Sequence, residues 1–190
     1  TDRLDYLENS FLQVVSQAVL AKVEAFAPDL VLAMAQAPLS RQALKRLQRD
    51  KVPTAMWFVE DHEVFPYWKA FAPLYDTFAV IQKGNFPACL SEVGQPNAFY
   101  LPLAADPSVH HPLSLSPLER RKYGSELSFV GAGYPNRRLA FRQLINYDLR
   151  IWGNDWDREY LLTPFLQRNG QRIDTDEIVR IFNASTININ

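Results

Sequence analysis

The stretch that decides the fold is "LSFVGAGYPNRRLAF", residues 127–141. An apolar run typical of a buried strand meets two glycines and a proline, and a helical pattern of apolar residues follows. Gly131 and Gly133 allow a sharp turn and a close approach to the main chain. Pro135 suits the first turn of a helix, where its missing N–H group is not needed. The stretch therefore predicts a strand–turn–helix unit of an α/β sheet.

The same alternation of short strands and helices extends to both sides of this stretch. Such apolar runs are typical of parallel strands covered on both faces. The predicted fold class is α/β with two Rossmann-like parallel-sheet units, the second incomplete. Strands are predicted at 29–35, 53–59, 76–81, 97–104, 149–153 and 186–190, and helices at 3–26, 40–50, 85–93, 137–145 and 174–185.

The first predicted helix has apolar residues every three or four positions, the pattern of a helix face turned toward a core. Pro28 ends this helix, because the residue before a proline is disfavoured in helical conformation. The residues of the face are Leu4, Leu7, Phe11, Val14, Ala18, Ala21 and Ala25.

The domain organisation predicted from the sequence has three parts. Residues 1–112 are expected to form an N-terminal Rossmann-like domain that lacks its first strand, and 113–125 a linker, the end of the stretch 105–125 with its three prolines and several serines. Residues 126–190 are expected to begin a second, C-terminal domain, in a fragment of a longer protein. An incomplete second sheet predicts an unpaired strand at 186–190 and self-association through it.

Composition excludes several classes of partner. The formal net charge is -1, with 47% hydrophobic and 22% charged residues, which is ordinary for a globular chain. Nucleic-acid binding normally shows a basic excess, so no nucleic-acid partner is predicted. No apolar run approaches the roughly 20 residues that span a bilayer. Cys89 has no second cysteine to pair with, which favours a reducing cytoplasm.

The turn after the strand at 127–130 has two interpretations. A helix N-terminus offers free N–H donors, and Arg137 and Arg138 add charge-assisted hydrogen bonds, so the loop suits a diphosphate. The alternative is a plain strand–turn–helix corner with solvated arginines. The dinucleotide pattern G-x-G-x-x-G is incomplete, because Asn136 stands where the third glycine belongs.

A second constellation, "MWFVEDHEVFPYW", covers residues 56–68. A buried strand delivers Glu60, Asp61 and His62 at its carboxyl end, the edge where ligands bind in open α/β sheets. His62 could orient a sugar hydroxyl, and Asp61 or Glu60 could act as a general base. The alternative is a solvated polar loop over packed aromatic residues. No metal site is predicted, because His62 is the single nitrogen ligand in this loop.

The next strand is followed by "IWGNDW", residues 151–156. Trp152 could stack on a base or a sugar, or belong to the core. Asn154 and Asp155 follow at the carboxyl end of that strand, and Asp155 lies about where a ribose-binding acid occurs in dinucleotide-binding units. These three residues are the predicted nucleotide or sugar contacts.

Five blocks together resemble the CgeB-like proteins, spore-maturation-type relatives of group 1 glycosyltransferases. The resemblance extends over nearly the whole chain from about residue 4, and the order of the blocks carries it. The blocks are "TAMWFVEDHE", "YLPLAADPSVHHP", "LSFVGAGYPNRR", "DLRIWGNDW" and "DEIVRIFNASTININ".

The resemblance implies a GT-B architecture of two Rossmann-like domains. It makes residues 1–112 the acceptor-side domain and residues 126–190 the start of the domain that binds a nucleotide-diphosphate sugar. It places Gly131, Gly133, Arg137 and Arg138 near the donor diphosphate and the 60–63 loop near the sugar. No cofactor is obligatory, because the donor is itself the substrate. The rival hypotheses are a non-catalytic two-lobed module that binds a nucleotide or sugar, and a nicotinamide-dependent oxidoreductase, which the incomplete glycine pattern disfavours.

Overall fold

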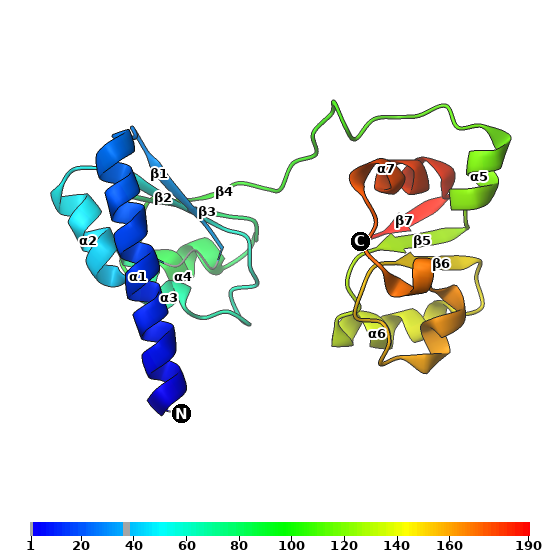
Figure 1. Ribbon diagram of the computed structural model, residues 1–190, viewed down its shortest axis with the longest axis horizontal. Coiled ribbons are helices and arrows are strands. Elements are labelled where there is room, and N and C mark those ends of the chain that lie inside the picture. The colour runs from blue at the N-terminus through cyan, green and yellow to red at the C-terminus, as the bar shows by residue number, and fades with distance from the viewer. Residues whose placement is uncertain (1, 36–38) are drawn as a thin grey trace. The chain divides into compact units, whose positions relative to one another are not determined.

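The computed structural model describes residues 2–35 and 39–190 of the chain. The chain divides into two compact units, Thr1–Ala104 (unit 1) and Ala105–Asn190 (unit 2). Each unit contains one parallel β-sheet with helices packed against it (Figure 1). The predicted α/β class with two Rossmann-like sheets is therefore confirmed.

Unit 1 has a four-stranded parallel sheet in the order β1-β2-β3-β4. Because all four strands are parallel, their carboxyl ends share one edge, where the loops after β2 and β3 meet. The strands are β1 (Val31–Met34), β2 (Thr54–Phe58), β3 (Thr77–Val80) and β4 (Ala98–Tyr100), and the helices are α1 (Asp2–Phe26), α2 (Arg41–Arg49), α3 (Trp68–Phe71) and α4 (Phe86–Glu92).

The core of unit 1 lies on one face of its sheet. Met56, Phe58, Phe78 and Val80 face it and are nearly completely buried. The opposite face was expected to be covered as well, but there Leu32 is 57% and Phe99 is 47% exposed. Its cover among the described residues includes the half-buried side chain of Trp57. The indole N–H of Trp57 donates to the carbonyl of Leu101 at 3.1 Å, so the ring reaches from β2 to the end of β4.

Helix α1 forms where predicted, but it turns a different face to the core. The predicted apolar face is exposed, with Phe11 at 66% and Val14 at 69%. The buried face contains Ser16, whose hydroxyl accepts a hydrogen bond at 2.7 Å from the backbone amide of Ser40, the N-cap residue of α2. A polar residue therefore fixes the buried face of α1. The apolar spacing of the sequence does not reveal that residue. The side chain of Leu4 lies outside the described residues.

Unit 2 has a three-stranded parallel sheet in the order β6-β5-β7. Phe129, Phe141 and Trp156 form edge-to-face and tilted aromatic pairs at the centre of its core. The strands are β5 (Leu127–Val130), β6 (Leu149–Trp152) and β7 (Ile187–Ile189), and the helices are α5 (Pro117–Tyr123), α6 (Pro135–Phe141) and α7 (Thr175–Ala184).

The segment predicted as a linker, 113–125, contains helix α5. Ser116 and Glu119 form a reciprocal capping box at its start, and Pro117 occupies its first turn. The segment before it is held to α7 by Asn183, which accepts from the Leu113 amide at 2.8 Å and donates to the His111 carbonyl at 3.1 Å. Ser116 and Pro117, two of the residues that suggested a linker, therefore begin a helix inside unit 2.

Strand β7 was predicted to be unpaired, and the structure corrects this. It pairs in parallel with β5, with Leu127 opposite Ile187 and Phe129 opposite Ile189. The pairing is possible because α7 crosses back and returns the chain beside β5. Self-association through this strand stays a prediction.

Candidate functional site

The loops that follow β5 and β6 are joined to each other by main-chain hydrogen bonds. The amide of Gly131 donates to the Trp152 carbonyl at 2.8 Å, and the amide of Gly133 donates to the Asn154 carbonyl at 2.9 Å. These are the amides that the sequence assigned to a diphosphate. The predicted amide cradle is therefore wrong for both glycines, because their hydrogens are already used within the protein.

The glycines are needed for the contact between these loops. A Cβ on Gly133 would stand 2.5 Å from the Asp155 carbonyl oxygen, and one on Gly153 would stand 2.3 Å from the Gly131 carbonyl oxygen. Gly153 also has a φ of 123°. Sequence reasoning missed Gly153, although its position directly after the apolar run "LRIW" was a usable signal.

The two arginines of α6 have different surroundings. The Arg137 guanidinium lies 5.2 Å from the ring centre of Phe129 and 4.9 Å from that of Tyr134, and donates to the Ala132 carbonyl at 3.1 Å. Arg138 donates to the carbonyls of Gly133 and Asp155, the latter at 3.0 Å. Arg138 therefore ties together the two loops at the carboxyl edge, whereas Arg137 packs on aromatic rings.

A pocket of about 310 Å³ opens at this edge of the sheet. In the part of the chain that the structure describes, no ion pair involves either of its arginines, Arg138 and Arg158, so no direct carboxylate contact neutralises them. Asp155 and Asp157 bring carboxylates to the same pocket. Arg158 was not singled out from the sequence. The lining residues are Gly133, Tyr134, Pro135, Arg138, Asp155, Asp157 and Arg158.

The predicted nucleotide contacts separate into two groups. Trp152 is 4% exposed and packs with Tyr123 and Ile181 in a core cluster, so its predicted contact with a base or sugar is wrong. Asn154 is half-buried, and its side-chain amide donates to the Asp155 carboxylate at 2.9 Å. Asp155 is exposed and lines the pocket, where its φ of 64° is held by the contacts of its carbonyl.

In unit 1, the loop after β2 places the three predicted catalytic residues differently. Asp61 is exposed and shapes the turn, because its carboxylate accepts from the amides of Glu63 at 2.8 Å and Val64 at 3.3 Å. The His62 ring stacks on Phe86 with 4.3 Å between ring centres. The Glu60 carbonyl accepts a hydrogen bond from the side chain of Gln82, which follows β3.

Three buried polar atoms near this loop have no hydrogen-bond partner among the described residues. They are Nδ1 of His62, the hydroxyl of Tyr67 and Oε1 of Gln82. Burial, and secondarily the Glu60 carboxylate, raise the pKa of Tyr67 to about 12. Tyr67 and Gln82 were not predicted as site residues. Gln82 follows the end of β3 by two residues, and Tyr67 ends the loop that connects β2 to α3, so both belong to loops at the edge that binds ligands.

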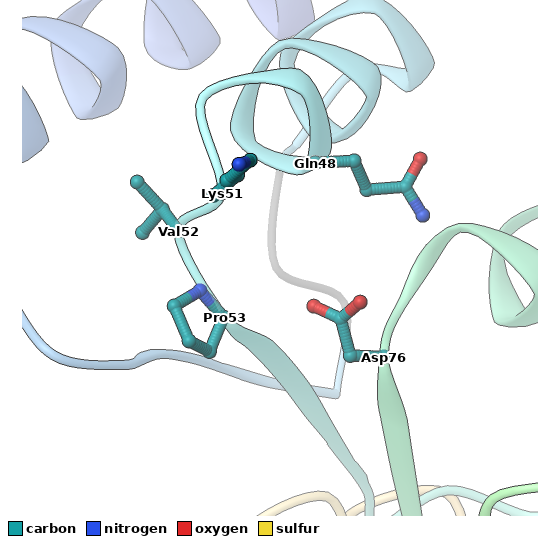
Figure 2. A pocket seen from close by; sticks show the side chains of 5 residues that line it. All are labelled: Gln48, Lys51, Val52, Pro53 and Asp76. Atoms are coloured by element: carbon teal, nitrogen blue, oxygen red, sulfur yellow. The ribbon is translucent and has the colours of Figure 1, made fainter.

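A pocket of about 360 Å³ lies at the opposite, amino edge of the unit 1 sheet. Figure 2 shows the side chains of Gln48 and Asp76 pointing into the space between α2 and the start of β3. The Asp76 carboxylate accepts from the amide and the hydroxyl of Thr54 at 2.8 and 2.9 Å, which joins the starts of β2 and β3. The polar atoms of Asp76 and Thr54 therefore hold the sheet together here.

Among the described residues, no group of three or more His, Cys, Asp or Glu side chains is arranged to hold a metal ion. Nor does any helix among them combine the length and the apolar character that a membrane span requires.

With this geometry in place, the chain can be compared with known proteins. Its fold of two units, each with a Rossmann-like parallel sheet, is similar to that of two solved structures. The Staphylococcus aureus MnaA–UDP co-structure matches with a TM-score of 0.54 and 13% identity over 95% of this chain and 56% of that chain. A putative UDP-N-acetylglucosamine 2-epimerase from Listeria monocytogenes matches with a TM-score of 0.56 and 11% identity over 92% of this chain and 55% of that chain.

In sequence, the chain is similar to spore protein CgeB of Bacillus subtilis (strain 168). It is 25% identical over 177 residues, which cover 90% of this chain and 54% of CgeB. The chain thus spans about half the length of this curated relative, and the expected resemblance to CgeB is confirmed as a sequence similarity. No protein-family model matches the chain.

Proposed function

We propose that this chain contributes the donor-side and acceptor-side groups of a glycosyltransferase that uses a nucleotide-diphosphate sugar. The observation that carries the proposal is the position of Arg138 and Arg158 at the pocket on the carboxyl edge of the unit 2 sheet. Open α/β sheets bind ligands at this edge. Guanidinium groups without carboxylate partners favour a dianionic diphosphate. Similarity to CgeB and the UDP-associated fold supports the same class.

The donor subsite would combine two kinds of contact. Arg138, held by two main-chain carbonyls, and Arg158 would pair with the diphosphate, and Asp155 and Asp157 would accept hydrogen bonds from sugar or ribose hydroxyls. Gly131 and Gly133 would serve this subsite by letting the loops pack closely rather than through their amides. Arg137 would support Tyr134, which also lines the pocket.

The acceptor side would use the loop after β2. His62, Tyr67 and Gln82 present hydrogen-bonding groups, which suit the hydroxyls of a sugar or other alcohol. Of the predicted bases, Asp61 has one oxygen committed to the turn, so Glu60 is the better candidate to take the acceptor proton. The acceptor oxygen would then bond to the anomeric carbon while the bond from that carbon to the diphosphate breaks.

The donor subsite is tested by calorimetric titration with UDP and UMP. Arg158→Ala should weaken UDP binding at least tenfold, about 1.4 kcal/mol, and Arg138→Ala should weaken it further, because it also loosens the loops. Arg121→Ala is the matched control, since Arg121 lies on α5 before the amino end of β5. Unchanged UDP affinity in Arg158→Ala, or equal affinity for UDP and UMP, would remove the diphosphate role.

Enzymatic transfer is tested separately by incubating the protein with a panel of nucleotide sugars. Slow release of the nucleoside diphosphate supports the transferase, and Glu60→Gln should slow that release while leaving UDP affinity unchanged. Binding without any release would instead favour the non-catalytic module that recognises the same ligand.

A further inference from the structure

The outward face of α1 carries an apolar stripe that none of the described residues of unit 1 covers. Leu7 is 56%, Phe11 66% and Val14 69% exposed, while the helix packs on the core through the opposite side, with Ser16 and Val19. Figure 1 shows the N-terminal half of α1 extending beyond the rest of unit 1. Because α1 is one continuous helix, it cannot also fold this stripe back onto its own unit.

The spacing of this stripe is that of a helix–helix seam. From Leu7, the apolar positions advance by four and three residues in turn, to Phe11, Val14, Ala18, Ala21 and Ala25. An average step of about 3.5 residues keeps such positions in line along a partner helix. The same spacing can also line a helix against a core, but here the stripe faces away from the core of unit 1.

The sizes of the side chains in the stripe indicate its partner. The large residues Leu7 and Phe11 lie in the first half of α1, and Ala18, Ala21 and Ala25 lie in the second half. We propose that α1 pairs antiparallel with α1 of a second copy of this chain, with the two-fold axis at Val14. In this register, Leu7 lies opposite Ala21 of the second copy, and Phe11 lies within one residue of the position opposite Ala18 of the second copy. Each layer then combines a large side chain with a small one, which fills the seam without overpacking.

The charges beside the stripe fit the same register. Glu8 and Lys22 flank the stripe on one side of the helix. The antiparallel pair brings Glu8 of each copy to within two residues of the position opposite Lys22 of the other, about 3 Å along the helix axis, which these long side chains can span. Such exposed pairs contribute little energy but set the orientation of the helices. A parallel pair would instead place the three alanines against each other and leave the large residues facing each other.

The expected interface is small. With 25 residues, α1 is about 37 Å long at 1.5 Å per residue. A helix pair of this length buries on the order of 1,200 Å² in total, the lower limit of stable interfaces. The dimer should therefore form reversibly, over roughly micromolar concentrations.

Sedimentation equilibrium of the whole chain tests the proposal directly. Wild-type protein should change from monomer to dimer between roughly 1 and 100 μM, and Val14→Glu should raise the dissociation constant more than tenfold. Gln13→Glu adds the same charge beside the stripe and should change it less than threefold. Both side chains are exposed, so circular dichroism should show an unchanged fold. A protein that stays monomeric throughout, or a dimer that Val14→Glu leaves intact, would overturn the proposal.

A charge exchange tests the antiparallel register. Glu8→Lys and Lys22→Glu should each weaken the dimer about two- to fivefold, and the double exchange should restore it. Additive weakening in the double variant would overturn this register. A dimer abolished by Leu32→Lys rather than by Val14→Glu would assign the interface to the exposed face of the unit 1 sheet and would also overturn the proposal.

Discussion

The carboxyl edges of the two sheets are built in opposite ways. In unit 2, the loops after β5 and β6 are joined main chain to main chain, and Arg138 adds side-chain hydrogen bonds across them. In unit 1, the loop after β2 rests on aromatic rings, and polar atoms of His62, Tyr67 and Gln82 are buried with no hydrogen-bond partner in the described part of the chain. In unit 2, the unpaired buried atom among the described residues is Oε2 of Glu177, which lies on α7.

This difference shows that the carboxyl edge of unit 2 is rigid, whereas the carboxyl edge of unit 1 has unmet hydrogen bonds. Buried polar groups are nearly always paired, and each exception needs a reason such as a ligand or an ordered water. Unit 2 therefore offers a preformed pocket in which hydrogen bonds hold Arg138 and Asp155. Unit 1 offers buried polar groups that a ligand or a water molecule can satisfy. The difference can be tested by substitutions that affect one edge and spare the other.

The largest effect is expected from Gly153→Ala. Its Cβ would lie 2.3 Å from the Gly131 carbonyl oxygen, and both atoms belong to main chains that cannot move independently. We expect a loss of about 3–4 kcal/mol in the free energy of unfolding, from overpacking together with left-handed backbone strain. Urea unfolding of unit 2 measures it.

Gly84→Ala is the matched control for this substitution. Gly84 has a φ of 95°, but a Cβ there would meet no atom within 4 Å. Its cost should be about 1 kcal/mol, from backbone strain alone. Equal costs at both glycines would show that the close contact between the two loops does not constrain unit 2.

Much of the fold, and less of the site, could be predicted from the sequence. Strand–helix alternation gave the right order of β1 to β7, because short apolar runs and capping residues such as Ser40 are local signals. The buried face of α1 was wrong, because Ser16 is buried by a hydrogen bond to a residue 24 positions away. Trp152 was misplaced for a similar reason, since its contacts with Tyr123 and Ile181 depend on tertiary packing.

Site geometry required the structure for a further reason. The sequence identified the glycines at 131 and 133, but a glycine that admits a ligand and a glycine that admits another loop have the same sequence pattern. The partner of Gly131 is Gly153, on a separate strand, and the two meet only when β5 and β6 pair. The arginine at 158 likewise reaches the pocket through the loop after β6.

A smaller effect is expected from Arg142→Ala, again confined to unit 2. Arg142 donates two hydrogen bonds to the carboxylate of Glu159, at 2.8 and 2.6 Å, and Glu159 is 6% exposed. Removing the arginine leaves a buried carboxylate unpaired, so we expect a loss of about 2–3 kcal/mol. The exposed pair of Arg46 and Glu24 in unit 1 is the comparison, and Arg46→Ala should change stability too little to resolve. Similar losses for both variants would contradict the contrast between the units.

The smallest effect concerns Tyr67 and has the opposite sign. The Tyr67 hydroxyl is buried without a partner, so Tyr67→Phe removes an unmet hydrogen bond and should raise the free energy of unfolding by up to about 1 kcal/mol at pH 7. Tyr147→Phe is the control, because Tyr147 is 49% exposed and its hydroxyl is open to water. If the acceptor-side proposal is right, Tyr67→Phe stabilises the fold while weakening binding of the hydroxyl-bearing ligand.

The pH dependence of the same variant sharpens the comparison. The pKa of Tyr67 is raised to about 12 in the folded protein, against about 10 in an unfolded chain. The stability that this group contributes is therefore fully present below about pH 10 and is lost as the pH rises through about 12. Tyr67→Phe should reduce that alkaline loss in unfolding experiments between pH 9 and 12, by less than the full pKa difference implies because the ring is only half-buried. If the variant and the wild type lose the same unfolding free energy between pH 9 and 12, water already reaches the Tyr67 hydroxyl. The contrast between the two edges would then depend on His62 and Gln82 alone.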